Sequence, residues 1–285
     1  MIVIKTGLIL EGGAMRGMFT AGVTDVMMEN GITFDGAIGV SAGAAFGCNY
    51  KSNQPGRSVR YNLRFCRDKR YCSVRSLIKT GNLYGADFCY HEIPDKLDVF
   101  DKETYNASPM EFYVVCTDAL TGKAVYKSCD KADNDCYEFI RASASMPIVS
   151  RPVSVGGYTL LDGGMADPIP VKYFESIGYD RNVVVLTQPD TYVKKAPSGL
   201  RVMKRLLRKY PEIYTAVATR HIGYNETVSY IREKEKRGEI FVIRPAAPLG
   251  IGKTEHDPKK IQSVYDIGRT EAEKNLAALK EYLKR

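Results

Sequence analysis

The sequence has no long apolar run and no recognisable secretion signal. No stretch of about 18 uninterrupted apolar residues, the length that a membrane-spanning helix needs, occurs in the 285 residues. Residues 1–10 lack the charged start, the long apolar middle and the small-residue cleavage site of a signal peptide. The sequence therefore predicts a protein without a membrane-spanning segment, and we expect a cytoplasmic location.

Histidine is scarce, and the cysteines do not form pairs of the kind that metal and redox sites use. Only His91, His221 and His256 are present, and none stands at a metal-ligand spacing from another histidine or cysteine. The seven cysteines are an odd number and include no Cys-x-x-Cys pair. This pattern predicts free, mostly buried thiols and implies neither a metal nor any other cofactor.

Basic residues outnumber acidic ones and give a net charge of +8, which favours an anionic partner. Residues 194–209, from Lys194 to Lys209, interleave basic and apolar side chains and are typical of an amphipathic basic helix. This segment predicts either a surface helix whose apolar stripe packs on the protein body or a peripheral contact with the anionic inner face of a membrane. Vesicle binding that ignores anionic lipid content would contradict the membrane contact. No nucleic acid is expected as a partner.

Apolar runs alternate with helix-compatible segments along the first two thirds of the chain. The strand candidates are residues 6–11, 34–40, 111–117, 123–127, 153–161 with a kink at 156–157, 182–187 and 239–244. The helix candidates are residues 18–30, 42–48, 133–145, 171–176 with Asp167 as its N-cap, 194–209 and a C-terminal helix from 258 with a weak spot at Gly268. This alternation predicts an α/β fold with three layers, α/β/α, around a mostly parallel sheet. We expect a catalytic core over residues 1–190 and a mostly helical extension over 191–285, packed on the same domain.

A G-x-S-x-G motif stands where the second apolar run meets a segment rich in small residues. Gly39, Ser41 and Gly43 are its fixed positions, and such a sharp strand-to-helix turn pushes the serine hydroxyl outward. The flanking glycines avoid clashes that a Cβ would cause. Ser41 is therefore a candidate nucleophile, and the helix start at Ala42 could stabilise an oxyanion.

A glycine-rich loop follows the first apolar run, over residues 12–17. Its spacing is G-G-x-x-x-G, which fits neither a dinucleotide-binding loop nor a phosphate-binding P-loop. Unobstructed backbone N–H groups at Gly12 and Gly13 could converge on one negative oxygen, as in an oxyanion hole. A turn required only for packing remains the alternative.

A serine nucleophile needs a base, and Asp162 is the candidate. It follows an apolar strand and precedes Gly163 and Gly164, so we expect its carboxylate at the sheet edge where ligands of open α/β sheets bind. Asp167 is a rival, but helix capping would explain it fully. An ordinary Asp-Gly turn is the other interpretation of Asp162.

Together these motifs resemble the patatin-like phospholipase family. The resemblance rests on residues 12–17, 39–43 and 162–164 in that order, supported by residues 141–147, and it covers roughly residues 6–187. It implies a Ser-Asp dyad of Ser41 and Asp162 and a lipid acyl-ester substrate. The remaining implied roles are an oxyanion hole at Gly12, Gly13, Ala14 and Ala42, with support from Arg16, Gly17, Gly39, Gly43, Gly163 and Gly164.

Two other functions remain open. A Ser-Asp-His esterase or thioesterase would use His221 or His256, which both follow Asp162 in the chain. A non-catalytic protein could instead use the basic residues to bind a membrane or a partner.

Overall fold

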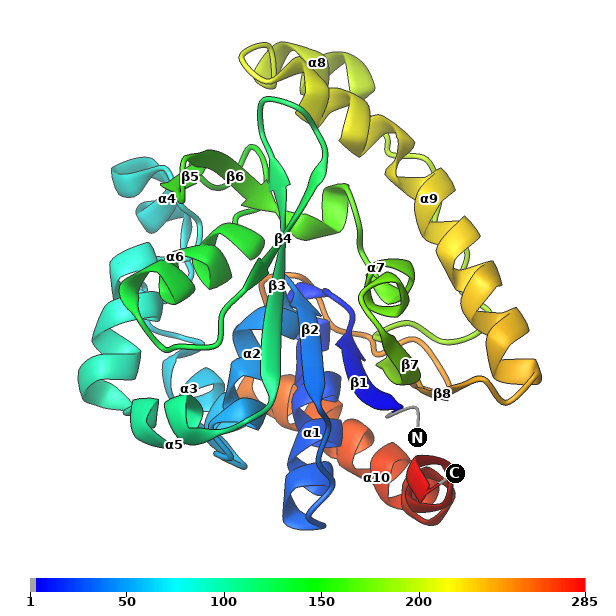
Figure 1. Ribbon diagram of the computed structural model, residues 1–285. Coiled ribbons are helices and arrows are strands. Elements are labelled where there is room, and N and C mark those ends of the chain that lie inside the picture. The colour runs from blue at the N-terminus through cyan, green and yellow to red at the C-terminus, as the bar shows by residue number, and fades with distance from the viewer. Residues whose placement is uncertain (1–3, 285) are drawn as a thin grey trace.

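An eight-stranded sheet forms the centre of the protein (Figure 1). The computed structural model describes residues 4–284, so the first three residues of the expected core and the last residue of the expected extension lie outside it. The strands are β1 (Lys5–Leu10), β2 (Gly36–Val40), β3 (Glu111–Asp118), β4 (Ala124–Ser128), β5 (Val153–Val155), β6 (Tyr158–Asp162), β7 (Tyr179–Val185) and β8 (Ile240–Ile243). Their order is β5-β6-β3-β2-β1-β7-β8, with β4 paired to β3 beside this path. Strands β3, β2, β1, β7 and β8 pair in parallel, so the predicted mostly parallel sheet is confirmed.

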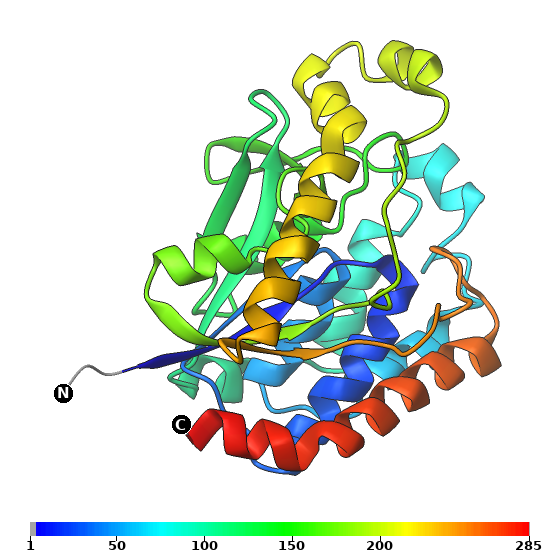
Figure 2. The same cartoon turned by 90° about the vertical axis from the view of Figure 1, so that its right-hand side faces the viewer.

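Helices cover both faces of this sheet, as Figures 1 and 2 show from two sides. They are η1 (Ala14–Arg16), α1 (Gly17–Glu29), α2 (Ala42–Lys51), α3 (Arg57–Phe65), α4 (Val74–Thr80), the π-helix η2 (Phe88–Leu97), α5 (Lys102–Ala107), α6 (Asn134–Ser143), η3 (Gly163–Met165), α7 (Val171–Ser176), α8 (Leu200–Leu206), α9 (Pro211–Lys236) and α10 (Pro258–Lys284). Alternate residues of β1 face opposite layers, because Leu8 packs among side chains of α1 and α10 while Ile9 packs with Tyr224 of α9. The predicted three-layer α/β/α arrangement is therefore confirmed.

Strand β6 is not one of the parallel strands of the sheet, because it pairs antiparallel with β3. Strand β2 ends at Val40, which lies beside Val115 of β3, and β3 continues past this point to Asp118. Strand β6 pairs antiparallel with that projecting end and places Asp162 beside Cys116. Asp162 therefore lies at the carboxyl end of its own strand and next to the carboxyl end of β2, although the two strands run in opposite directions.

Two local predictions around β6 were wrong. Residues 153–161 do not form one kinked strand but the hairpin of β5 and β6, because Gly156 and Gly157 both adopt positive φ and complete a two-residue turn. Helix α7 begins after Pro170, and Asp167 does not cap it. The carboxylate of Asp167 instead accepts a hydrogen bond of 2.8 Å from the Tyr126 hydroxyl.

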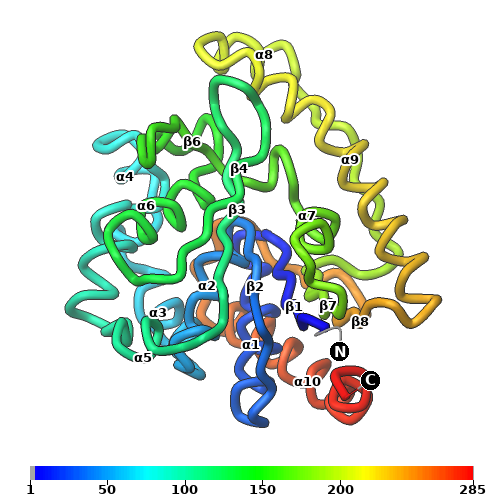
Figure 3. The backbone as a smooth tube through the Cα atoms, in the orientation of Figure 1, coloured from blue at the N-terminus to red at the C-terminus, as the bar shows by residue number. Residues whose placement is uncertain are grey.

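The predicted basic helix over 194–209 was also wrong in extent. Only the seven residues of α8 are helical, at the tip of the molecule farthest from α10 (Figure 3). Lys194 lies outside that helix, in an extended segment whose backbone exchanges two hydrogen bonds with the Asn225 side chain. The predicted membrane contact stays a prediction and now concerns a much shorter basic segment.

Helix α10 crosses α1 at a very close approach between glycines. A Cβ on Gly268 would lie 2.1 Å from the carbonyl oxygen of Phe19, and a Cβ on Gly22 would lie 2.2 Å from that of Tyr265. The interpretation of Gly268 as a weak spot was therefore wrong, since its missing side chain is what lets the two helices meet. The Tyr265 hydroxyl also donates a 2.7 Å hydrogen bond to the buried carboxylate of Asp25 in α1.

The seven cysteines are free, and all except the partly exposed Cys89 are buried, which confirms the prediction of buried thiols. Within residues 4–284 no helix is both long enough and apolar enough to cross a membrane. Across the same residues, no group of three or more His, Cys, Asp or Glu side chains is placed to hold a metal ion.

The helix crossing gives a prediction with a matched control. We expect Gly268→Ala to lower the free energy of unfolding by about 1–3 kcal/mol, because its Cβ would press on the backbone of α1. A Cβ added at Gly223 in α9 would point into open space. Because alanine has a better helix propensity than glycine, Gly223→Ala should raise the free energy of unfolding by about 0.5–1 kcal/mol. Urea unfolding of both variants measures the difference. A gain at both positions would contradict the close crossing.

Candidate active site

Ser41 occupies a strained turn between β2 and α2. Its φ of 55° and ψ of −120° lie outside the regions that non-glycine residues favour. The turn is tight because a Cβ on Gly39 would lie 2.5 Å from the Gly43 carbonyl oxygen, and a Cβ on Gly43 would lie 2.3 Å from that of Leu10. The backbone thus forms the sharp elbow that a G-x-S-x-G motif predicts.

The side chain of Ser41 points directly at Asp162. Its hydroxyl donates a 2.7 Å hydrogen bond to Oδ2 of the carboxylate, while Oδ1 accepts a 2.8 Å bond from the Gly164 N–H. Both side chains are buried, with 9% and 7% of their surfaces exposed. Burial raises the pKa of Asp162 above its ordinary value, and the nearby charges of Arg220 and Lys253 oppose this rise.

A segment of α6 and its following turn supports both members of the pair. The Ser143 hydroxyl accepts a 2.8 Å hydrogen bond from the Ser41 N–H and donates a 2.6 Å bond to the carbonyl of Val115. The carbonyl of Ser145 accepts a 2.8 Å bond from the Asp162 N–H. Sequence reasoning noted this segment only as part of the family resemblance and missed the two serines, because their partners lie on other strands.

Free backbone donors surround the serine. In the part of the chain that the structure describes, the N–H groups of Gly12, Gly13, Ala14 and Ala42 donate no hydrogen bond. A Cβ on Gly12 would lie only 3.0 Å from the Ser41 Cβ, so this loop passes directly against the serine. Ala14 has a φ of 49°, a strained value that turns the chain into η1. The loop and the start of α2 therefore present unsatisfied donors beside one hydroxyl.

The remaining residues of the expected site have different roles. A Cβ on Gly17 would lie 2.8 Å from that of Ala42, and a Cβ on Gly163 would lie 2.1 Å from the Val115 carbonyl oxygen, so both glycines permit close packing. The Arg16 side chain makes no hydrogen bond or ion pair within residues 4–284, and its Nε atom is buried. No side-chain bond of Arg16 therefore supports the expectation that it holds the loop in shape.

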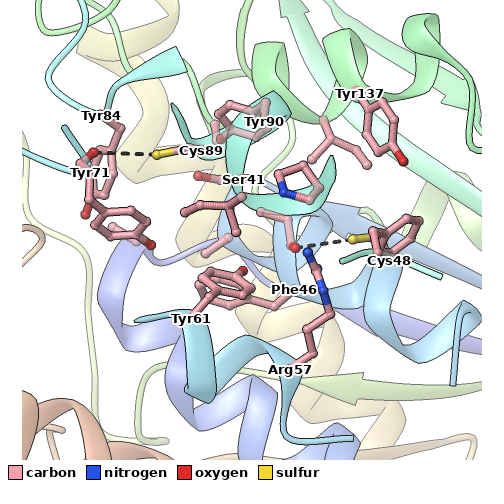
Figure 4. A pocket seen from close by; sticks show the side chains of 18 of the residues that line it. Ser41, Phe46, Cys48, Arg57, Tyr61, Tyr71, Tyr84, Cys89, Tyr90 and Tyr137 are labelled. Atoms are coloured by element: carbon pink, nitrogen blue, oxygen red, sulfur yellow. Dashed lines mark hydrogen bonds between the residues drawn. The ribbon is translucent and has the colours of Figure 1, made fainter. Parts of the chain in front are cut away.

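A largely apolar pocket opens beside Ser41, between α2, α3, η2 and α6 (Figure 4). Its aromatic lining consists of Phe46, Tyr61, Tyr71, Tyr84, Tyr90, Phe100 and Tyr137. The buried guanidinium of Arg57 also borders it, but this group donates to the carbonyl of Asp98 and to Asn49 Oδ1, so its donors are largely satisfied within the protein. The pocket therefore offers a neighbouring molecule mainly carbon surface and tyrosine rings.

Neither candidate histidine lies between the serine and the aspartate. His256 Nδ1 contacts the carbonyl oxygen of Cys66 at 2.5 Å. His221 Nδ1 is buried and has no hydrogen-bond partner within residues 4–284. Because the Ser41 hydroxyl donates directly to Asp162, the geometry leaves no place for a histidine in a Ser-His-Asp relay.

Sequence reasoning missed a buried carboxylate that ties three segments together behind the glycine-rich loop. Glu11 Oε2 accepts hydrogen bonds of 2.5 Å from the N–H and 3.1 Å from the hydroxyl of Thr187, and Oε1 accepts a 2.9 Å bond from the Tyr224 hydroxyl. An acidic residue directly after an apolar strand was the only signal for it. Glu11 joins the loop after β1 to the end of β7 and to α9.

Comparison with known proteins shows similarity over nearly the whole chain. A profile of the patatin-like phospholipase family matches residues 8–175, and one described as a domain of unknown function (DUF6363) matches residues 210–284. The uncharacterized protein YjjU of Escherichia coli is 27% identical over 86% of this chain and 70% of its own length.

Other matches cover less of each protein. An uncharacterized NTE family protein of Mycobacterium tuberculosis is 26% identical, over 64% of this chain and 48% of its own length. The lysophospholipase nte1 of Emericella nidulans is 28% identical, over 61% of this chain but only 11% of its own length. The crystal structure of VipD from Legionella pneumophila aligns with a TM-score of 0.42 at 12% identity, over 95% of this chain and 67% of that one.

The first profile covers more than half of the chain, including the elbow, the glycine-rich loop and the aspartate. The chain therefore belongs to the patatin-like phospholipase family, a family of lipid ester hydrolases.

Proposed function

We propose that this protein cleaves acyl ester bonds of lipids, with Ser41 as the nucleophile and Asp162 as the base. The observation that carries this proposal is the 2.7 Å hydrogen bond from the serine hydroxyl to a buried carboxylate. A serine on a strained elbow, next to a base and to free backbone donors, is the arrangement that acyl transfer requires. Family membership supports the lipid substrate class.

In the first half of the reaction, Ser41 Oγ attacks the ester carbonyl carbon as its proton passes to Asp162 Oδ2. Burial favours this transfer, because a raised pKa brings the proton affinity of the carboxylate closer to what a general base needs. The bond from the Gly164 N–H holds Oδ1 and leaves Oδ2 for the serine. Asp162, now protonated, then gives its proton to the leaving alcohol.

The free N–H groups of Gly12, Gly13, Ala14 and Ala42 are the donors for the negative oxygen of the tetrahedral intermediate. These N–H groups can bind the oxyanion without rearrangement, because none of them donates a hydrogen bond to an acceptor within the described residues. In the second half, water attacks the acyl-enzyme and loses its proton to Asp162. Ser41 then leaves with that proton, and the carboxylic acid is released.

The pocket beside Ser41 is the site that we assign to the acyl chain. It begins at the serine and is walled mainly by aromatic and aliphatic side chains, including Phe46, Ile93 and Ile140. Moving methylene groups from water into such a pocket contributes about 0.8 kcal/mol for each buried CH₂. A lipid chain in this pocket would place its ester at the nucleophile.

The dyad is tested by substitution of its members and of the rival histidine. We expect Ser41→Ala and Asp162→Ala each to lower ester hydrolysis by at least about 10³-fold, because the nucleophile or its base is removed. His256→Ala should keep activity close to the unmodified protein. Covalent labelling by a fluorophosphonate probe should disappear in Ser41→Ala.

Circular dichroism of each variant controls for folding. Full activity in Asp162→Ala with loss in His256→Ala would refute the dyad. Absence of probe labelling in the folded, unmodified protein would favour the non-catalytic binding protein instead.

The raised pKa of Asp162 gives a pH dependence with a definite sign. The carboxylate must be ionised to accept the serine proton, so kcat/KM should rise with pH through the raised pKa, with a midpoint above the ordinary value of 3.8. Arg220 lowers this pKa, so Arg220→Gln should move the midpoint to higher pH. A pH series with a neutral short-chain ester measures both effects, and a midpoint below 3.8 would contradict the burial of the base.

A further inference from the structure

Four cationic side chains gather around the dyad without any ion pair: Arg16, Lys194, Arg220 and Lys253. None of them forms a salt bridge or donates a side-chain hydrogen bond within residues 4–284. The Nε atoms of Arg16 and Arg220 are buried and have no acceptor. Both side chains are only partly exposed, and buried donors are normally hydrogen-bonded, so these two cations lack the protein acceptors that such groups usually have.

Local contacts place Arg220 and Lys194 near the dyad. Nη2 of Arg220 lies close to Gly164, because a Cβ added to Gly164 would be only 2.8 Å from it. The N–H of Gly164 donates to the carboxylate of Asp162. Lys194 Nζ lies 4.4 Å from the centre of the Tyr224 ring, whose hydroxyl bonds to Glu11 just before the glycine-rich loop.

Lys253 approaches from the segment before α10. Its backbone carbonyl accepts a 2.9 Å hydrogen bond from Tyr84, a residue of the apolar pocket. Lys253 is exposed, and its charge lowers the pKa of both Asp162 and Lys194, so it lies within electrostatic range of both groups.

Arg220 approaches Ser41 from a different side than the acyl pocket. The apolar pocket lies among α2, α3, η2 and α6, whereas Arg220 comes from α9 on the other side of the sheet (Figure 1). The apolar pocket is not lined by Lys194, Arg220 or Lys253. An ester centred on Ser41 would therefore have its acyl chain in the pocket and its alcohol part at the cations.

Charge in the cluster is unbalanced. Burial and the charge of Arg220 lower the pKa of Lys194 to about 8, with smaller contributions in the same direction from Arg16 and Lys253, while the charge of Glu11 raises it. Both oxygens of Glu11 are already hydrogen-bonded, to Thr187 and Tyr224. Mutual repulsion of this kind is relieved when an anion binds.

We propose that these four cations form a binding site for the phosphate of an anionic lipid head group. The proposal rests on the proposed function, which places the ester at Ser41, and it names the alcohol side of the substrate. Phosphate suits the cluster because guanidinium groups donate to it in pairs and the lysine ammonium groups add charge. Since none of the four cations forms an ion pair within residues 4–284, net-negative phosphate heads are preferred over zwitterionic and neutral ones.

This site gives the C-terminal segment a role. Arg220 lies in the segment that matches the domain of unknown function, and Lys253 follows it in the same segment. The patatin-like match ends at residue 175, so three of the four cations come from beyond it. The C-terminal segment thus determines head-group selectivity for a dyad that the N-terminal part supplies.

The test compares two esters with the same hexanoyl chain, one on glycerol 3-phosphate and one on glycerol. The ratio of their kcat/KM values should favour the phosphate ester in the unmodified protein. Arg220→Gln and Lys194→Gln should each lower that ratio by roughly 10- to 100-fold, mainly through KM, since each removes a charge-assisted hydrogen bond. Lys236→Gln, an exposed cation on the same helix α9, should leave the ratio at the unmodified value.

Several outcomes would overturn the proposal. Equal losses for both esters, measured above the acid limb of each variant, would mean that the cations do not distinguish the phosphate ester from the neutral one. A protein without preference for the phosphate ester would also refute it. If inorganic phosphate saturates the site at micromolar concentration and blocks both esters, the ligand is free phosphate and the head-group assignment fails.

Binding separates this proposal from the proposed function. Calorimetry should show that the Ser41→Ala variant binds the phosphate ester. The double variant Ser41→Ala/Arg220→Gln should bind it at least about 10-fold more weakly. Such binding without hydrolysis by the unmodified protein would refute the esterase and keep the phosphate site. Hydrolysis of both esters without a dependence on Arg220 would refute the phosphate site and keep the esterase.

Discussion

The hydrogen bond between Ser41 and Asp162 joins residues that lie 121 positions apart in the chain. It forms because β3 continues past the end of β2 and gives β6 a free edge to pair with. The end of β6 then lies beside the elbow, where a Cβ at Gly43 or Gly163 would collide with neighbouring backbone. The position of this one bond therefore depends on the strand register across three strands and on the absence of side chains at the points of closest approach.

Two electrostatic effects oppose each other at the dyad. Burial raises the pKa of Asp162, and the charges of Arg220 and Lys253 lower it. A carboxylate with no cation nearby would hold its proton more strongly, and an exposed one would be a weaker base. In our proposals the same cations serve two purposes, since they keep Asp162 ionised and attract the phosphate of the substrate.

The C-terminal segment packs against the core in two separate ways. Helix α10 fits against α1 through its glycine at position 268 and through the Tyr265 bond to Asp25. Helix α9 covers the other face and reaches the loop after β1 through the bond between Tyr224 and Glu11. The first contact contributes to stability, whereas the second holds α9 where its Arg220 lies close to Gly164 and Asp162.

Local sequence rules were sufficient for the elements of the site. A strand, a glycine-flanked serine and a helix of small residues follow each other in one short segment, so the elbow at Ser41 could be predicted without knowledge of the rest of the fold. The alternation of apolar runs and helical segments likewise predicted the layered α/β fold. These features depend on neighbours in the chain, which the sequence displays directly.

Only the tertiary structure decided what depends on contacts between distant segments. The direction of β6, the packing role of Gly268 and the support of Ser41 by Ser143 have no local signal, because each partner lies on another element. The basic run at 194–209 suggested one long helix, but only Leu200–Leu206 is helical, and Lys194 lies outside this helix with its ammonium group over the Tyr224 ring. Side-chain charge and spacing can be read from the sequence, but the side on which a cation is buried is set by the packing of the whole chain.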